Sequence, residues 1–192
     1  MSANFLLLES IGGEGMNYAS IKIMDVANGP GVRMSLFVSG CTHYCKGCFN
    51  KEAWDFNYGE PFTQNEIDYI IDYVSSPYIA GLTILGGEPM EQANQQGLLP
   101  LLRQFREKLP EKSVWCFTGY DFEKDVLGRM MNEYPETKEL VSYFDVMVDG
   151  KFVEELKDLS IRFRGSSNQR IIMVKESLEK GEIVLWDESK ER

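Results

Sequence analysis

The sequence predicts an α/β fold with a mostly parallel sheet and flanking helices. Two observations lead to this class. Short segments rich in β-branched and apolar residues alternate at least three times with segments of helical period, which is the sequence sign of βαβ units. The chain has 192 residues, of which 43% are hydrophobic, so one domain with a substantial core is expected.

The first elements are two strands, at 20–26 and 33–40, joined by a glycine-containing turn. A helix is expected within 62–75. There Thr63 and Glu66 form a capping-box pattern, and isoleucines recur at helical spacing behind them. The turn between the strands and the cap before the helix therefore set the boundaries of these elements.

The remaining elements follow from the same two periods. They are a strand running into a glycine loop (81–89), a helix starting near Pro100 (98–109), a strand (113–120), a helix capped by Asp121 (122–131), a strand ending in a turn (143–150) and two short strands (170–174 and 181–186). The last eight residues, 185–192, are expected to form a solvated tail. Because functional loops follow the carboxyl ends of parallel strands, the loops after these strands should gather on one rim.

Charge and hydropathy exclude some classes of function. The formal net charge is −10, which argues against nonspecific nucleic-acid binding, since that needs a footprint of Lys and Arg. No apolar run approaches the roughly 20 residues that span a bilayer, and no convincing signal peptide is present, so a cytoplasmic location is the default. Residues 1–15 precede a second methionine, Met16. They are either a flexible tail or a stretch upstream of the true translation start.

Three of the four cysteines lie within a single loop. Cys41, Cys45 and Cys48 have a spacing that, in a reducing compartment, indicates a metal site rather than disulfides. A structural zinc would need a fourth ligand, for which His43 and Cys116 are the candidates. Cys116 lies mid-strand, where a small buried cysteine is the favoured interpretation. A [4Fe–4S] cluster held by three thiolates would instead leave one iron open for a small molecule.

This cysteine spacing after a first strand, followed by GGEP at Gly86–Pro89, resembles the radical S-adenosylmethionine superfamily. The resemblance implies a full or partial βα barrel and a [4Fe–4S] cluster on the three cysteines, with S-adenosylmethionine chelating the open iron. The implied contacts to S-adenosylmethionine are Gly47, Cys48, Phe49 and Gly87. We add Glu88, whose carboxylate can accept a charge-assisted hydrogen bond from an ammonium group. Many members carry an aromatic residue before the third cysteine, whereas this chain has Gly47 there.

The resemblance narrows to one family of activating proteins. From about Tyr18 to Ile172 the chain carries, in order, NGPGVRMSLFVSGC, CKGCFNKEAW, GGEP, WCFTGY, VDGKFVEELKD and RGSSNQR. Together these are similar to the activating proteins of the anaerobic (class III) ribonucleoside-triphosphate reductase. The family implies cleavage of S-adenosylmethionine to methionine and a 5′-deoxyadenosyl radical, which makes a glycyl radical on the reductase. It also implies a flavodoxin-type electron donor. Since this chemistry demands no general acid or base, no catalytic side chain is expected, and His43 is expected to tune the cluster or to be solvated.

Several alternatives stay open at this point. The chain could activate another glycyl-radical enzyme, such as pyruvate formate-lyase, or be a small synthase of a modified base. A different class is a non-catalytic zinc-binding module. Residues 164–168 either shape an entrance for the partner's glycine or form a polar turn, and the aromatic residues Trp54, Trp115 and Tyr120 are expected to pack. The expected parts are an extension at 1–15, an activase domain at 16–174 and an extension at 175–192.

Overall fold

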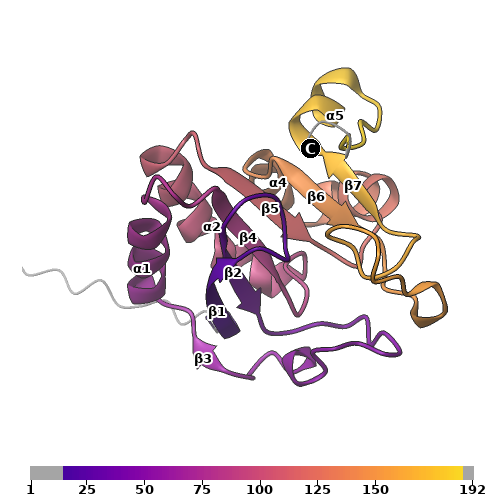
Figure 1. Cartoon of the computed structure of the whole chain (residues 1–192), viewed down its shortest axis with the longest axis horizontal. Helices are drawn as coiled ribbons and strands as arrows, with labels where there is room; N and C mark the ends of the chain where they lie inside the picture. Colours follow the sequence, from indigo (N-terminus) through magenta and orange to yellow (C-terminus); the bar gives the residue numbers. More distant parts are fainter. Residues whose placement is uncertain (1–14, 188–192) are drawn as a thin grey trace, which may run out of the picture.

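The computed structural model describes residues 15–187 and shows one sheet with helices packed against it (Figure 1). Residues 1–14 and 188–192 lie outside the described part, and with them almost all of the expected N-terminal extension and the end of the tail. The strands are β1 (Asn17–Asp25), β2 (Arg33–Val38), β3 (Glu60–Pro61), β4 (Gly81–Gly86), β5 (Ser113–Phe117), β6 (Val146–Asp149) and β7 (Arg170–Met173). The longer helices are α1 (Gln64–Val74), α2 (Gln92–Lys108), η2 (Phe122–Met130), α4 (Thr137–Ser142) and α5 (Val174–Lys180), and the short ones are η1 (Glu52–Trp54), α3 (Met131–Glu133) and η3 (Glu154–Leu156).

The α/β class is confirmed, but the sheet is mixed rather than mostly parallel. Its order is β3-β1-β2-β4-β5-β6-β7, and only the run β2-β4-β5-β6 is parallel. The pairs β1–β2, β1–β3 and β6–β7 are antiparallel. The reason lies in the connections. The short turn after β1 returns the chain beside it, whereas a parallel neighbour needs a crossover such as α1 or α2.

The parallel run positions the loops of interest as the sequence predicted. The cysteine loop follows β2, GGEP follows β4, residues 118–120 follow β5 and the turn at Gly150 follows β6. Since these four strands are parallel, their carboxyl ends share one rim of the sheet. The capping box of α1 is also confirmed. The Thr63 side chain accepts from the backbone N–H of Glu66, and the Glu66 side chain accepts from the backbone N–H of Thr63.

Helix α2 begins earlier than the sequence predicted. It starts at Gln92, and Pro100 lies inside it on the exposed side, so the prediction of a start near Pro100 is wrong. The helical residues before Pro100 are stabilised by hydrogen bonds from two side chains. The Gln95 side chain donates to Met90 O at 2.8 Å, and the buried Asn94 amide bonds three backbone carbonyls. The stabilisation from these bonds exceeds the cost of the one backbone hydrogen bond that Pro100 cannot donate.

The C-terminal region differs from both predictions made for it. Residues 181–186 form no strand, and a single bridge joins Leu185 to Ile172 in β7. The residues just before them, Val174–Lys180, form helix α5, which was not predicted. Nor is the tail solvated throughout. The Trp186 ring packs 5.7 Å from the Trp115 ring, and the backbone N–H of Trp186 donates to Ile171 O. The aromatic residue holds this end of the chain against the sheet.

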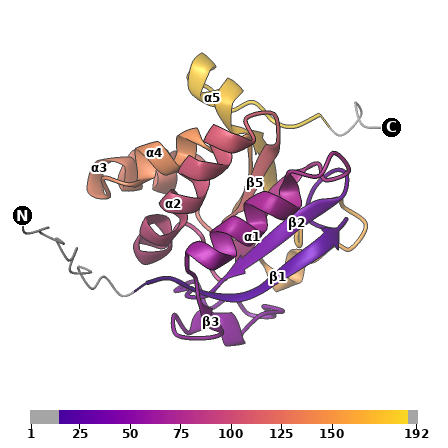
Figure 2. The same ribbon diagram turned by 90° about the vertical axis from the view of Figure 1, so that its left-hand side faces the viewer.

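The two faces of the sheet are covered differently. Figure 2 shows α1, α2 and α4 over one face, where the main core contains Leu36, Ile84 and Cys116 from consecutive strands. The buried position of Cys116 confirms the interpretation of a core cysteine. Trp115, its neighbour in β5, points to the other face, where Phe163 and Trp186 cover it. None of the helices within residues 15–187 is long and apolar enough to cross a membrane.

Asp145 joins α2, β5 and α5 and should make stability depend on pH. Its carboxylate accepts from Arg106 at 2.6 Å, Lys175 at 2.5 Å and the Val114 N–H at 2.7 Å. Burial pushes the pKa of Asp145 upward, but the hydrogen bonds from these three donors outweigh it and lower the pKa. A carboxyl with a lowered pKa in the folded state contributes stability above its unfolded pKa, and this contribution is lost as the pH falls through the folded value.

We therefore expect Asp145→Asn to cost about 2 kcal/mol of unfolding free energy at pH 7. We also expect it to flatten the decline in stability below about pH 4. Urea unfolding between pH 7 and pH 3 measures both effects. Asp72→Asn, at an exposed position of α1, controls for the loss of one negative charge. An unchanged pH dependence in Asp145→Asn would contradict the assignment.

Candidate functional site

The cysteine loop leaves β2 through a glycine that no other residue could replace easily. Gly40 has φ +93, and a Cβ built on it would lie 2.2 Å from the Phe56 ring. Beyond it, Cys41 is buried, while Cys45 and Cys48 are partly buried. The Cys48 N–H donates to Cys45 O at 3.2 Å, which closes a turn between the second and third thiols. The loop thus presents three sulfurs from one tight segment.

Burial favours the protonated thiol at two of the three cysteines, Cys41 and Cys45. Burial, with a smaller contribution from the Glu88 charge, raises the pKa of Cys41 to about 12, and burial also raises the pKa of Cys45. A coordinating metal would reverse this, because it binds the thiolate. In the described part of the chain, one carboxylate oxygen each from Asp121, Glu123 and Asp149 lie within 4.8 Å of one another. The three cysteine sulfurs do not all lie this close together.

The GGEP loop is bonded directly to the backbone of the cysteine loop. The Gly87 N–H donates to Val38 O at 2.7 Å, and the Glu88 N–H donates to Gly40 O at 2.8 Å. A Cβ on Gly87 would lie 2.5 Å from Gly40 O and 2.9 Å from Ala53 O. The second glycine of the motif is therefore required by the close approach of two backbones, whatever it contacts in a ligand.

The Glu88 carboxylate is buried, with 1% exposure, and all of its contacts are within the chain. One oxygen accepts from Met90 N–H at 2.9 Å and from the Thr118 hydroxyl at 2.7 Å. The other oxygen accepts from Gly119 N–H at 2.7 Å and contacts His43 Nε2 at 2.9 Å. A ligand ammonium could reach this carboxylate only by displacing one of these donors. His43 is not solvated, since its side chain is 13% exposed.

Asn94 is a site residue that the sequence analysis missed. Its buried amide donates to Ser39 O at 2.9 Å and to Glu88 O at 2.8 Å, which ties the start of the cysteine loop to GGEP. A signal for it existed in the sequence. Asn94 lies four residues before Leu98 and eight before Leu102, so it is a polar residue on the apolar stripe of α2. A polar residue in such a position has to bond something buried.

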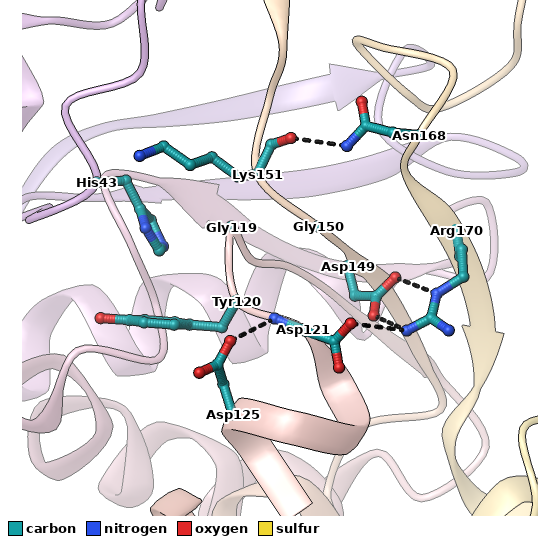
Figure 3. Close-up of a pocket in the computed structure, with 10 residues that line it drawn as sticks. All are labelled: His43, Gly119, Tyr120, Asp121, Asp125, Asp149, Gly150, Lys151, Asn168 and Arg170. Atoms are coloured by element: carbon teal, nitrogen blue, oxygen red, sulfur yellow. Dashed lines mark hydrogen bonds and ion pairs between the residues drawn. The ribbon is translucent and has the colours of Figure 1, made fainter.

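A cavity of about 500 Å³ opens beside the cysteine loop, at the ends of β5, β6 and β7 (Figure 3). Its lining residues are His43, Gly119, Tyr120, Asp121, Asp125, Asp149, Gly150, Lys151, Asn168 and Arg170. In Figure 3 His43 and Tyr120 lie on one side of the cavity and the ion pair of Asp149 and Arg170 lies on the other. The hydrogen bonds that Arg170 donates to the Asp149 carboxylate chiefly raise the pKa of Arg170, which therefore stays charged.

The loop after β6 packs on the outer side of the cysteine loop. Gly47, with φ +74, lies against the Glu154 side chain, which a Cβ on Gly47 would approach to 2.8 Å. Lys46 pairs with Glu154 at 3.0 Å. Asn168 closes the loop by donating to Lys151 O at 2.9 Å. Phe49 is 83% exposed, so only its backbone position is fixed near the cysteines.

The structure thus brings together Cys41, Cys45, Cys48, Gly87 and Glu88 at one rim, with the cavity beside them. It leaves the Phe49 ring in solvent and places Cys116 in the core on β5. Trp115 packs on the far face, as expected of an aromatic core residue. Tyr120 packs against the main core, as expected, and it also lines the cavity, with its ring 4.3 Å from that of His43.

Known proteins resemble this chain over most of its length. A family model described as "4Fe-4S single cluster domain" matches residues 27–172. The chain is 41% identical over 156 residues to the anaerobic ribonucleoside-triphosphate reductase-activating protein of Escherichia coli (strain K12), across 80% of this chain and 96% of the relative. Proteins of the same name from Vibrio cholerae serotype O1 and Enterobacteria phage T4 are 40% and 38% identical, each across 81% of this chain and across 97% and 93% of the relatives.

Proposed function

The chain belongs to the family of anaerobic ribonucleoside-triphosphate reductase-activating proteins, and from this premise we propose that it activates such a reductase by generating a glycyl radical on it. The observation that carries the proposal is the cysteine loop. It offers three thiols on one rim, bonded to GGEP and beside a cavity of about 500 Å³. The reductase is accordingly the protein partner.

The donor set fits a [4Fe–4S] cluster with one open iron. Cys41, Cys45 and Cys48 supply three soft ligands, and no fourth thiol of the described chain is free, because Cys116 is enclosed in the core. Cys41, Cys45 and Cys48 would hold the cluster, which would supply the electron for reductive cleavage of S-adenosylmethionine and so for making the glycyl radical on the reductase. The protein's own task is to hold the reactants close together and to exclude water.

The cavity suits the adenosyl part of S-adenosylmethionine. The Lys151 ammonium can donate to ribose hydroxyls, and Tyr120 offers an aromatic face. The Asp149 carboxylate lies in the wall of the cavity but is buried, and it already accepts from Arg170 and from the Phe122 N–H. We assign the methionine end to the backbone near Gly87 and Glu88, and further contacts to Gly47–Phe49. Glu88 takes part through its place in the loop, since four donors of the chain already occupy its carboxylate.

The other candidate functions are less well supported. A zinc module needs His43 or Cys116 as the fourth ligand, but Cys116 packs in the core, and the family model that matches the chain describes a 4Fe-4S domain. An activase for another glycyl-radical enzyme has the same chemistry, so the choice of partner rests on the names of the relatives. Neither alternative is favoured by a separate observation of this structure.

Four finer points are part of the same proposal. The sheet would serve as the partial βα barrel that the superfamily resemblance implies. A flavodoxin-type protein would donate the electron. The protein would work in the cytoplasm, where clustered thiols stay reduced. The activase domain would comprise 16–174, between extensions at 1–15 and 175–192.

The proposal is tested by anaerobic reconstitution with iron and sulfide, followed by electron paramagnetic resonance. We expect about four iron atoms per chain and a reduced [4Fe–4S]⁺ signal that changes when S-adenosylmethionine is added. Incubation with the cognate reductase should then yield a glycyl-radical signal. A protein that retains only zinc, or a cluster indifferent to S-adenosylmethionine, would refute the assignment.

A further inference from the structure

Glu88 connects three loops that belong to three different strands. Its own loop follows β4, its partners Thr118 and Gly119 follow β5, and His43 comes from the cysteine loop after β2. A carboxylate with 1% exposure is stable only when its oxygens are bonded, so each of these contacts is required. Of the four donors, His43 is the only one that belongs to the cysteine loop.

His43 is held on two sides as well as by its hydrogen bond. Its ring lies 4.3 Å from the Tyr120 ring, and a Cβ built on Gly119 would approach it to 2.6 Å. The loop is also held at Thr42, whose N–H donates to Glu91 at 3.0 Å, and Tyr120 donates to the same oxygen at 3.2 Å. His43 therefore lies in a slot formed by the loops after β4 and β5.

The position of His43 in the chain gives this contact its importance. It stands two residues from Cys41 and two from Cys45, so its side chain fixes the segment between the first two thiols. The same histidine lines the cavity assigned above to the adenosyl group. A movement of His43 would therefore shift the cysteines relative to the other residues that line the cavity.

We propose that His43 is a positioning residue, whose hydrogen bond to Glu88 sets the cysteine loop in register with the β4 and β5 loops that hold S-adenosylmethionine. This inference rests on the proposed function, because it concerns the geometry between the cluster and its ligand. In this role His43 acts through its hydrogen bond to Glu88 and not as a ligand of the cluster. Its removal leaves an unbonded lone pair on a buried carboxylate and frees the segment between two ligands. Partners of this kind, one shell beyond the ligands, typically contribute about 10- to 100-fold to affinity or activity.

The test compares His43→Leu, which keeps the bulk but removes the donor, with His43→Gln, which keeps an N–H donor. Lys46→Ala is the matched control in the same loop, because the Lys46 side chain is 77% exposed. Hydrogen exchange of the iron-free proteins should be faster at the Gly119 amide and at residues 42–45 in His43→Leu, and close to wild type in the other two variants. This readout requires neither cluster nor S-adenosylmethionine.

A second readout uses the reconstituted proteins. His43→Leu should retain its iron but need about 10- to 100-fold more S-adenosylmethionine to change the resonance signal, while His43→Gln should restore much of the affinity. The inference is overturned if His43→Leu matches wild type in both readouts, or if His43→Gln is as impaired as His43→Leu. If the wild-type cluster ignores S-adenosylmethionine, the proposed function fails, and the exchange experiment still decides whether His43 fixes the loop.

Discussion

Replacing Cys41, Cys45 or Cys48 by serine, one at a time, is expected to abolish activation of the reductase. Each thiol is one of only three in the loop, and a hydroxyl is a poor substitute for a soft thiolate on iron. Since partners beyond the ligands already contribute about 10- to 100-fold, loss of a direct ligand should exceed about 100-fold in activity. Iron content after reconstitution and the yield of glycyl radical measure the effect.

Cys116→Ala is the matched control for this series. It removes a buried thiol that β5 contributes to the main core. It should therefore lower the free energy of unfolding by about 1 kcal/mol and leave the cluster intact. A loop variant that retains a full cluster and normal activity would show that the ligand assignment is wrong. Loss of iron in Cys116→Ala, with the fold preserved, would place the fourth thiol in the site after all.

Gly87→Ala should be nearly as damaging, although it adds a single methyl group. The new Cβ would lie 2.5 Å from Gly40 O and 2.9 Å from Ala53 O, and both are backbone atoms that cannot rotate away. The two loops would have to separate, at a cost of about 1–3 kcal/mol and with loss of the bonds from Gly87 to Val38 and from Glu88 to Gly40. We expect a lowered melting temperature and a cluster whose signal no longer responds to S-adenosylmethionine.

Gly181→Ala provides the comparison for Gly87→Ala. Gly181 ends α5 with φ +69 and has no atom within 4 Å of a built Cβ, so alanine strains the backbone there by about 1 kcal/mol without a collision. It should lower stability and spare activity. Equal effects of the two variants on S-adenosylmethionine binding would mean that crowding at Gly87 is not what matters.

The parts of the site that could be predicted are those carried by short, local patterns. The cysteine spacing, the glycines of GGEP and the alternation of strands and helices are each contained in one segment, and the parallel order then brings the loops to one rim. The capping box at Thr63 was predictable for the same reason. In each case neighbouring residues determine the conformation.

The parts that could not be predicted depend on distant partners. The four donors to Glu88 come from positions 43, 90, 118 and 119, and no local pattern joins them. Helix α2 extends past the expected start because Asn94 bonds carbonyls in other loops. Trp186 was expected in solvent because its partners, Trp115 and Phe163, lie far away in the sequence. Tertiary contacts overrode the local preference in all three regions.

The way Glu88, Asn94 and Gly119 hold the cysteine loop has a consequence for how the protein is made. Ribosomes deliver the chain from its N-terminus, so the three thiols emerge well before the residues that fix them. Until β5 has been synthesised and paired, the loop lacks its Glu88–Gly119 anchor, and the thiols are open to oxidation or to stray metal. We therefore expect correct loading of a cluster only after the central strands have been translated and paired.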